Sequence, residues 1–148
     1  MNTDFLIVGG GVIGLSVARE LRKRSTARIS VVDRGAAGAE SSWAAAGMLA
    51  PNAETHTLDA FFHLCTESNA LYPRFAAELL DETGIDIELD RSGTLYVGFG
   101  TADQDEIVER YNWQTNAGIE VEKLAAADIL KAEPAISTDV ASGLFYPN

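Results

Sequence analysis

The chain has 148 residues, 47% of them hydrophobic, which is the length of one domain with enough apolar residues for a packed core. Its formal net charge is −11, from 11 basic and 22 acidic residues. Because nucleic acids and anionic membranes are also negatively charged, this charge argues against nonspecific binding to either.

The single cysteine, Cys65, cannot form an internal disulfide and suits a reducing compartment. The acidic start, residues 1–4, is unlike a signal peptide. The apolar stretch from Phe5 to Leu15 has only eleven residues, four of them glycine, which is too short for a membrane span. We therefore expect a cytoplasmic protein.

The first elements predict a strand, a helix and a second strand. Residues 5–8 form a short apolar run, as expected for a strand buried on both faces of a parallel sheet. Apolar residues at every fourth position from Ile13 to Leu21 indicate a helix, which ends at Ser25. A second apolar run, 29–32, closes on Asp33 and completes a βαβ unit with a right-handed crossover.

A glycine-rich turn joins the first strand to its helix. Residues 9–14 read Gly-Gly-Gly-Val-Ile-Gly and fit the GxGxxG fingerprint in the context that it requires. Gly9 allows the tight turn, Gly11 lets the backbone approach a pyrophosphate, and Gly14 lets helix and strand touch. Asp33 is placed to accept hydrogen bonds from ribose hydroxyls, and its charge would repel the 2′-phosphate of NADP. The turn therefore predicts dinucleotide binding.

The middle of the chain predicts a loop and a long helix. Residues 35–51 are rich in Gly, Ala and Ser, which indicates a loop with a helical turn through 44–46. Helical apolar spacing follows between Leu58 and Thr83, and Gly84 is suited to end this helix. Pro73 should break or kink it, since proline loses a backbone hydrogen bond.

The last third predicts strands and two shorter helices. Residues 85–89 and 94–99 have strand propensity and flank a turn, so we expect them to pair with each other in antiparallel fashion. Thr101 and Gln104 resemble a capping box. The elements expected after it are a helix ending at Gly118, a short helix over 125–132 stopped by Pro134, and a strand over 143–146.

The stretch from Gly38 to Pro51 decides between dinucleotides. It holds the pair Ser41 and Ser42 and the run Ala44 to Met48. This stretch resembles the segment after the second strand in the D-amino-acid oxidase superfamily of FAD-dependent oxidoreductases, most of all in the glycine oxidases of thiamine biosynthesis. Small residues there would let main-chain N–H groups reach the flavin edge.

The resemblance assigns cofactor roles to residues of the first fifty. The pyrophosphate would be held by Gly9, Gly11, Val12, Ile13 and Gly14, and the adenosine end by Asp33 and Arg34. Ser41 and Ser42 would bind phosphate, and the flavin would lie against Ala46, Gly47 and Met48. The family usually has Glu where this chain has Asp33, which leaves NAD as an alternative cofactor, but the resemblance of the stretch from Ser41 to Met48 favours FAD. No catalytic residue and no metal ligand is assigned.

The resemblance implies a flavoprotein oxidoreductase that deaminates a small amino acid such as glycine. The flavin would take a hydride from the α-carbon, and dioxygen would reoxidise it. A D-amino-acid dehydrogenase or a sarcosine-oxidase-like enzyme with another electron acceptor is an alternative, and a noncatalytic dinucleotide-binding module is an alternative of another class. A homo-oligomer stays open.

The predicted fold is α/β, with a Rossmann-like FAD-binding part over 1–84 and the start of an α+β substrate domain with antiparallel strands over 85–148. Only two parallel strands are evident, although a dinucleotide-binding half normally has three. The family's proteins are also considerably longer. We therefore expect an incomplete chain that ends before the residues that grip the substrate.

Other polar and aromatic residues have simpler interpretations. His63 lies among apolar residues and is expected in the core or at its boundary, and no partner is evident for His56. Tyr111 and Trp113 have the spacing of packing residues on a helix. The acidic residues on that helix have no His or Cys beside them, so we interpret them as a solvated face and not as a metal site: Asp103, Asp105, Glu106 and Glu109.

Overall fold

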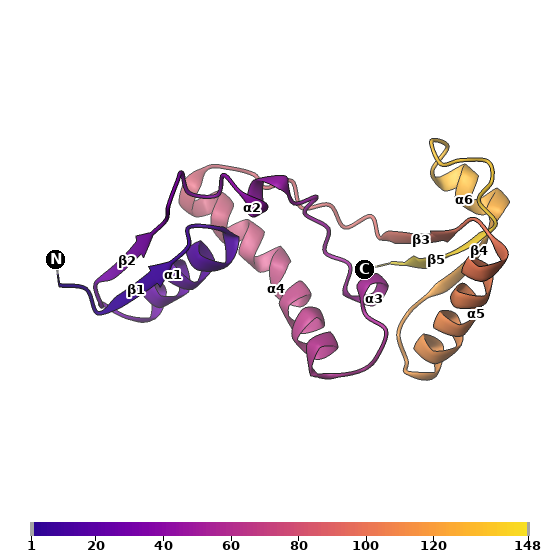
Figure 1. The fold of residues 1–148 in the computed structure, drawn as a ribbon, viewed down its shortest axis with the longest axis horizontal. Coiled ribbons are helices and arrows are strands. Elements are labelled where there is room, and N and C mark those ends of the chain that lie inside the picture. The colour runs from indigo at the N-terminus through magenta and orange to yellow at the C-terminus, as the bar shows by residue number, and fades with distance from the viewer. Residues whose placement is uncertain (1, 148) are drawn as a thin grey trace. The chain divides into compact units, whose positions relative to one another are not determined.

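The computed structural model describes residues 2–147 (Figure 1). They fall into two compact units that divide between Met48 and Leu49. Within the described residues, no helix is both long and apolar enough to span a membrane. The functional division into 1–84 and 85–148 stays a prediction.

The first unit contains the predicted βαβ arrangement. Strand β1 (Phe5–Val8), helix α1 (Val12–Arg24) and strand β2 (Ile29–Val32) follow one another, and the two strands pair in parallel from Phe5 opposite Ile29 to Val8 opposite Val32. The α1 helix packs against both strands. This confirms the α/β fold class for the first part of the chain.

The loop after β2 differs in one detail from its prediction. A single helical turn, α2 (Ser41–Ala44), comes before the expected position at 44–46. At Ala45 the backbone is already extended, with a ψ of 139°, so the turn cannot continue into the following residues.

The strands of the first unit are more exposed than we expected. The side chains of Leu6 and Val8 are 58% and 81% exposed, and Ile13 at the start of α1 is 79% exposed. The prediction of burial on both faces is wrong for the described chain, because one helix cannot cover a two-stranded parallel sheet on both sides.

The second unit begins with two helices, α3 (Pro51–Glu54) and α4 (Ala60–Thr83). At the start of α4 the Asp59 carboxylate accepts a hydrogen bond of 2.9 Å from the Phe62 N–H, and at its end Gly84 has a φ of +72°. The helix continues through Pro73, so the expected break does not occur, and a kink there stays a prediction. Both ends of α4 are capped, and the single lost hydrogen bond at Pro73 does not end the helix.

The rest of the second unit is an antiparallel sheet with two helices. Its elements are β3 (Thr94–Gly98), α5 (Thr101–Asn116), β4 (Glu122–Ala125), α6 (Ala126–Ala132) and β5 (Ser142–Tyr146), and the strand order is β3-β5-β4. Both pairs are antiparallel. The sheet type was predicted correctly, but β4 was not foreseen.

The predicted partner of β3 is wrong. Residues 85–89 form no strand, and β3 pairs instead with β5, from Thr94 opposite Tyr146 onward. The Asp86 carboxylate accepts a hydrogen bond of 2.8 Å from the Glu88 N–H, and Glu88 has a φ of +54°. This local turn keeps the segment from extending along β3.

The predicted capping box of α5 is also wrong. Gly100 is the N-cap and offers no side chain. The Asp103 carboxylate reaches back instead and accepts a hydrogen bond of 2.9 Å from the Phe99 N–H. The predicted end of the helix is confirmed, since Gly118 follows the C-cap residue Ala117 and has a φ of +79°.

The core of the second unit lies between its sheet and its helices. Ile107 of α5, Ile129 of α6 and Leu144 of β5 are fully buried, and Tyr146 is 2% exposed. Gly98 allows α5 to approach β3 closely, because a Cβ there would lie 2.8 Å from the Ile107 side chain. This packing fixes α5 firmly on the sheet.

Candidate functional site

The glycine turn has the geometry that its sequence predicts. Gly9 has a φ of +108°, which L side chains rarely adopt. A Cβ on Gly14 would lie 2.0 Å from the Gly9 carbonyl oxygen, and one on Gly11 would lie 2.9 Å from the Ser42 hydroxyl. The end of the strand and the start of the helix can therefore meet only because Gly14 lacks a side chain, and Gly11 leaves space for the Ser42 hydroxyl.

Asp33 binds the turn from the end of β2. One oxygen of its carboxylate accepts a hydrogen bond of 2.7 Å from the Gly10 N–H, and the other accepts one of 2.8 Å from the Gly35 N–H. These hydrogen bonds lower the pKa of the Asp33 carboxyl, and the one from Gly10 has the larger effect. An ionised carboxylate has further lone pairs, so Asp33 can also accept hydrogen bonds from a sugar hydroxyl.

The predicted phosphate-binding serines differ in their surroundings. The Ser42 hydroxyl oxygen accepts a hydrogen bond of 2.9 Å from the Val12 N–H, the first amide of α1. The structure thus brings Ser42 together with Gly11 and Val12, although 30 residues separate Ser42 from Val12. Ser41 is exposed at the first position of α2.

A shallow hollow of about 430 Å³ lies beside the carboxyl ends of β1 and β2. Its lining residues come from both strands and the following loop: Val8, Gly9, Val32, Asp33, Arg34 and Glu40. Arg34 and Glu40 form a two-pronged ion pair there, with Nε and Oε1 2.8 Å apart. The place of Glu40 in this lining was not predicted, because no sequence pattern of a loop indicates that Arg34 and Glu40, six residues apart, form an ion pair.

The predicted flavin-facing residues form an irregular stretch at the end of the first unit. Ala46 is exposed and Gly47 has a φ of +76°, which places its backbone in the left-handed region that favours glycine. Met48 is 65% exposed. The main-chain groups of this stretch and the large apolar side chain of Met48 therefore lie at the surface.

The residues present fit a dinucleotide such as FAD. Helix α1 begins at Val12, directly after a turn of three glycines that carry no side chains, and this is the form of site that binds a diphosphate. The hollow beside it holds a carboxylate suited to a ribose, and it lies at the carboxyl ends of parallel strands, where such ligands bind.

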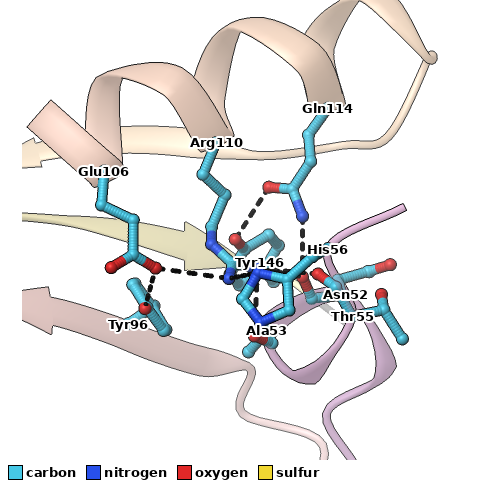
Figure 2. Close-up of polar contacts among 9 residues, drawn as sticks. All are labelled: Asn52, Ala53, Thr55, His56, Tyr96, Glu106, Arg110, Gln114 and Tyr146. Atoms are coloured by element: carbon cyan, nitrogen blue, oxygen red, sulfur yellow. Dashed lines mark hydrogen bonds and ion pairs between the residues drawn. The ribbon is translucent and has the colours of Figure 1, made fainter. Parts of the chain in front are cut away.

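A second polar centre, which we call the Arg110 cluster, lies in the second unit and was missed by the sequence reasoning. Figure 2 shows the Arg110 guanidinium, only 2% exposed, directed from α5 toward the backbone of residues 52–55. Its Nη2 lies 3.0 Å from Nδ1 of His56, which thus has a partner, contrary to expectation. Arginine on a helix gives no sequence signal of such burial.

Further members complete the Arg110 cluster. The Tyr96 hydroxyl donates a hydrogen bond of 2.6 Å to the Glu106 carboxylate, and the Arg110 guanidinium lies 4.6 Å from the centre of the Tyr96 ring. The same hydrogen bond raises the pKa of Tyr96 and lowers the pKa of Glu106. Glu106 thus does more than contribute to a solvated acidic face.

The remaining candidates have no site role in the structure. His63 is exposed, so its expected place in the core or at its boundary is wrong, and its ring contacts that of Phe62 edge-on. Tyr111 and Trp113 are half-buried, in agreement with a packing role. Among the described residues, no group of three or more His, Cys, Asp or Glu side chains could hold a metal ion.

Comparison with known proteins identifies the class. Residues 4–148 match the model of the DAO family, described as FAD dependent oxidoreductase, so the chain belongs to this family of FAD-dependent oxidoreductases. This confirms the predicted family and its cofactor, FAD.

Among its relatives, the chain is similar to glycine oxidases. It is 35% identical to glycine oxidase of Geobacillus kaustophilus over 97% of this chain and 38% of the relative. It is 36% identical to the bifunctional protein ThiO/ThiG of Trichormus variabilis, over 99% of this chain and 22% of that protein. The crystal structure of the Geobacillus enzyme superposes with a TM-score of 0.92 at 34% identity, over 98% of this chain and 39% of that one. The chain thus spans less than two fifths of the length of these relatives.

Proposed function

We propose that the chain supplies the FAD-binding part of an enzyme that oxidatively deaminates a small amino acid such as glycine, with dioxygen as the electron acceptor. The observation that carries this proposal is the glycine turn between β1 and α1, where Gly9 has a φ of +108° and Gly14 lets the start of the helix lie against the end of the strand. The similarity to glycine oxidases supports the choice of substrate class.

The residues of the first unit have distinct roles in this proposal. The N–H groups of Gly11, Val12 and Ile13 bind the pyrophosphate at the positive end of α1. Ser42, whose hydroxyl now lies 2.9 Å from the Val12 N–H, donates to the same phosphate oxygens without adding charge. Ser41 lies next to it in the chain and is proposed for the same phosphate.

The ends of the cofactor are assigned to the loop after β2. Asp33 accepts hydrogen bonds from the ribose, and Arg34 lies at the adenosine end, where it now pairs with Glu40. Main-chain groups of 46–48 orient the flavin ring, which, when bound, supplies the hydride acceptor for oxidation of the α-carbon. This chain's own contribution is binding and orientation, and no proton-transferring residue is assigned to it.

The proposal is tested on the purified full-length natural protein. We expect it to be yellow, with flavin absorbance near about 450 nm, and to release hydrogen peroxide when glycine is added in air. Turnover only with an artificial acceptor would instead indicate a dehydrogenase, and turnover of N-methylated amino acids alone would indicate a sarcosine-oxidase-like enzyme. A colourless, folded protein that binds NAD would contradict the proposal.

A further inference from the structure

The loop after β2 fixes the backbone of Glu40 beside the hollow at the carboxyl ends of β1 and β2. Two residues before it, the Gly38 N–H donates a hydrogen bond of 2.8 Å to the Gly10 carbonyl of the glycine turn. Directly after it, α2 begins, and the Glu40 carbonyl accepts hydrogen bonds of 3.0 and 3.1 Å from the N–H groups of Trp43 and Ala44. The position of Glu40 is thus set on both sides.

The side chain of Glu40 pairs with that of Arg34, which lines the same hollow. Nε of Arg34 donates a hydrogen bond of 2.8 Å to Oε1 of Glu40, and Nη2 donates a second one to Oε2. This fork of two donors is also the geometry with which arginine binds a phosphate. While the pair persists, that edge of the guanidinium is not available to a phosphate.

Stability alone does not account for this pair. The side chains of Arg34 and Glu40 are 80% and 58% exposed, and exposed ion pairs contribute little to the free energy of unfolding. Glu40 is the N-cap residue of α2, but its side chain makes no cap hydrogen bond. Its charge and its position beside the hollow instead point to a role toward a ligand.

That role concerns the 2′-position of the ribose that Asp33 is proposed to bind. The Asp33 carboxylate repels a 2′-phosphate, but a guanidinium on the next residue offsets this repulsion. An arginine near the ribose is indeed the group that accommodates the 2′-phosphate of NADP. Without Glu40, the hollow would therefore hold one carboxylate and one free guanidinium, and it would discriminate poorly.

We propose that Glu40 is a specificity-determining residue of the cofactor site. Its carboxylate occupies Arg34 and leaves the hollow with two negative groups against one positive group, Asp33 and Glu40 against Arg34. An adenosine ribose with a free 2′-hydroxyl, as in FAD, is then accepted, and a ribose with a 2′-phosphate is rejected. This rests on the proposed function, in which the adenosine end lies at Asp33 and Arg34.

The test measures this preference in the full-length natural protein after removal of its flavin. FAD is titrated in the presence of ADP or of ADP with an added 2′-phosphate, two competitors that differ only at the 2′-oxygen. The ratio of their inhibition constants reports the discrimination, because effects common to both competitors cancel. The thermal midpoint of each variant shows that it is folded.

The variants separate the charge of Glu40 from the release of Arg34. Glu40→Gln keeps the shape of the side chain and loses its charge, and Glu40→Gln combined with Arg34→Gln also removes the guanidinium. Glu20→Gln is the matched control. Glu20 lies on α1 outside the lining of the hollow, is 43% exposed and pairs with Arg24 at 3.3 Å.

For the wild type we expect the 2′-phosphorylated competitor to bind at least about tenfold more weakly than ADP. Glu40→Gln should reduce this ratio at least about fivefold, because one negative charge is lost and the guanidinium is released, and added salt should weaken the effect. The double variant should regain most of the ratio, since its hollow has the net charge of the wild type. The control should match the wild type.

An unchanged ratio in folded Glu40→Gln that still binds FAD would overturn the inference and leave the proposed function intact. An equal reduction in the Glu20 control would also overturn it, because the ratio would then report only the net charge of the protein. A double variant that keeps the reduced ratio would overturn the part assigned to Arg34. A wild-type protein that binds neither FAD nor ADP would overturn the proposed function, and the inference with it.

Discussion

At the scale of single residues, Ser42 connects the loop to the start of α1. Its hydroxyl caps the Val12 N–H at 2.9 Å, so Ser42→Ala should lower the free energy of unfolding by about 1 kcal/mol, the usual cost of losing a helix cap. Ser41→Ala is the matched control, because Ser41 is exposed, and should change it by less than about 0.5 kcal/mol. Urea denaturation measures the free energy of unfolding of both variants. Equal losses in the two variants would contradict the assignment of Ser42 as the cap of Val12.

Asp33 gives the same region a dependence on pH. The N–H groups of Gly10 and Gly35 lower its pKa from the usual value of 3.8. A lowered pKa means that the contribution of Asp33 to stability is fully present above 3.8 and is lost as the pH falls through the lower, folded value. The amide resonance of Gly10 should therefore titrate with a midpoint below 3.8, and a midpoint above it would contradict this contact.

Single residues also show where sequence reasoning reached its limit. The glycine turn could be predicted because the fingerprint encodes a local geometry, in which Gly14 must lack a side chain. Arg110 could not be, because its acceptors at Ala53 and Thr55 are carbonyl groups, which every residue type has. Contacts to the backbone of a distant segment leave no mark on that segment's sequence.

At the scale of elements, α4 should depend on its N-cap. The Asp59 carboxylate accepts a hydrogen bond from the Phe62 N–H. This hydrogen bond is the largest cause of the lowered pKa of Asp59. Asp59→Ala should lower the thermal midpoint by about 2 to 4 °C at pH 7, whereas Glu67→Ala, exposed on the same helix, should leave it nearly unchanged.

The same prediction has a test in acid. Because the folded pKa of Asp59 is lowered, the difference between Asp59→Ala and the wild type should shrink as the pH falls through that value. Calorimetry at a series of pH values measures this. A difference that stays constant down to pH 2 would show that the cap contributes nothing through its charge.

The elements that were predicted correctly have local signals, and the others do not. The βαβ unit and α4 follow from apolar periodicity within the elements and from Gly84, the residue directly after α4. The pairing of β3 with β5 joins residues about fifty positions apart, from Thr94 opposite Tyr146, and propensity says nothing about such partners. Residues 85–89 have strand propensity, but the turn at Asp86 and Glu88 overrides it.

At the scale of the whole molecule, the first unit leaves apolar surface uncovered. Leu6, Val8 and Ile13 are each more than half exposed, and the chain spans only 38% of its Geobacillus relative. We expect residues 1–148 alone to bind FAD at least about tenfold more weakly than the full-length protein and to show no turnover, because a site on a partly covered sheet is less well ordered. One tightly bound FAD per purified 148-residue chain would contradict this.

The central claim is that the glycine turn holds FAD, and the most direct test is FAD titration of three forms of the full-length protein. Gly14→Ala places a Cβ 2.0 Å from the Gly9 carbonyl oxygen, whereas a Cβ on Gly35 meets nothing within 4 Å. We predict one FAD per chain for the wild type and for Gly35→Ala, and binding at least about tenfold weaker for a folded Gly14→Ala. Equal FAD affinity in all three forms, or no FAD in the wild type, would contradict the account.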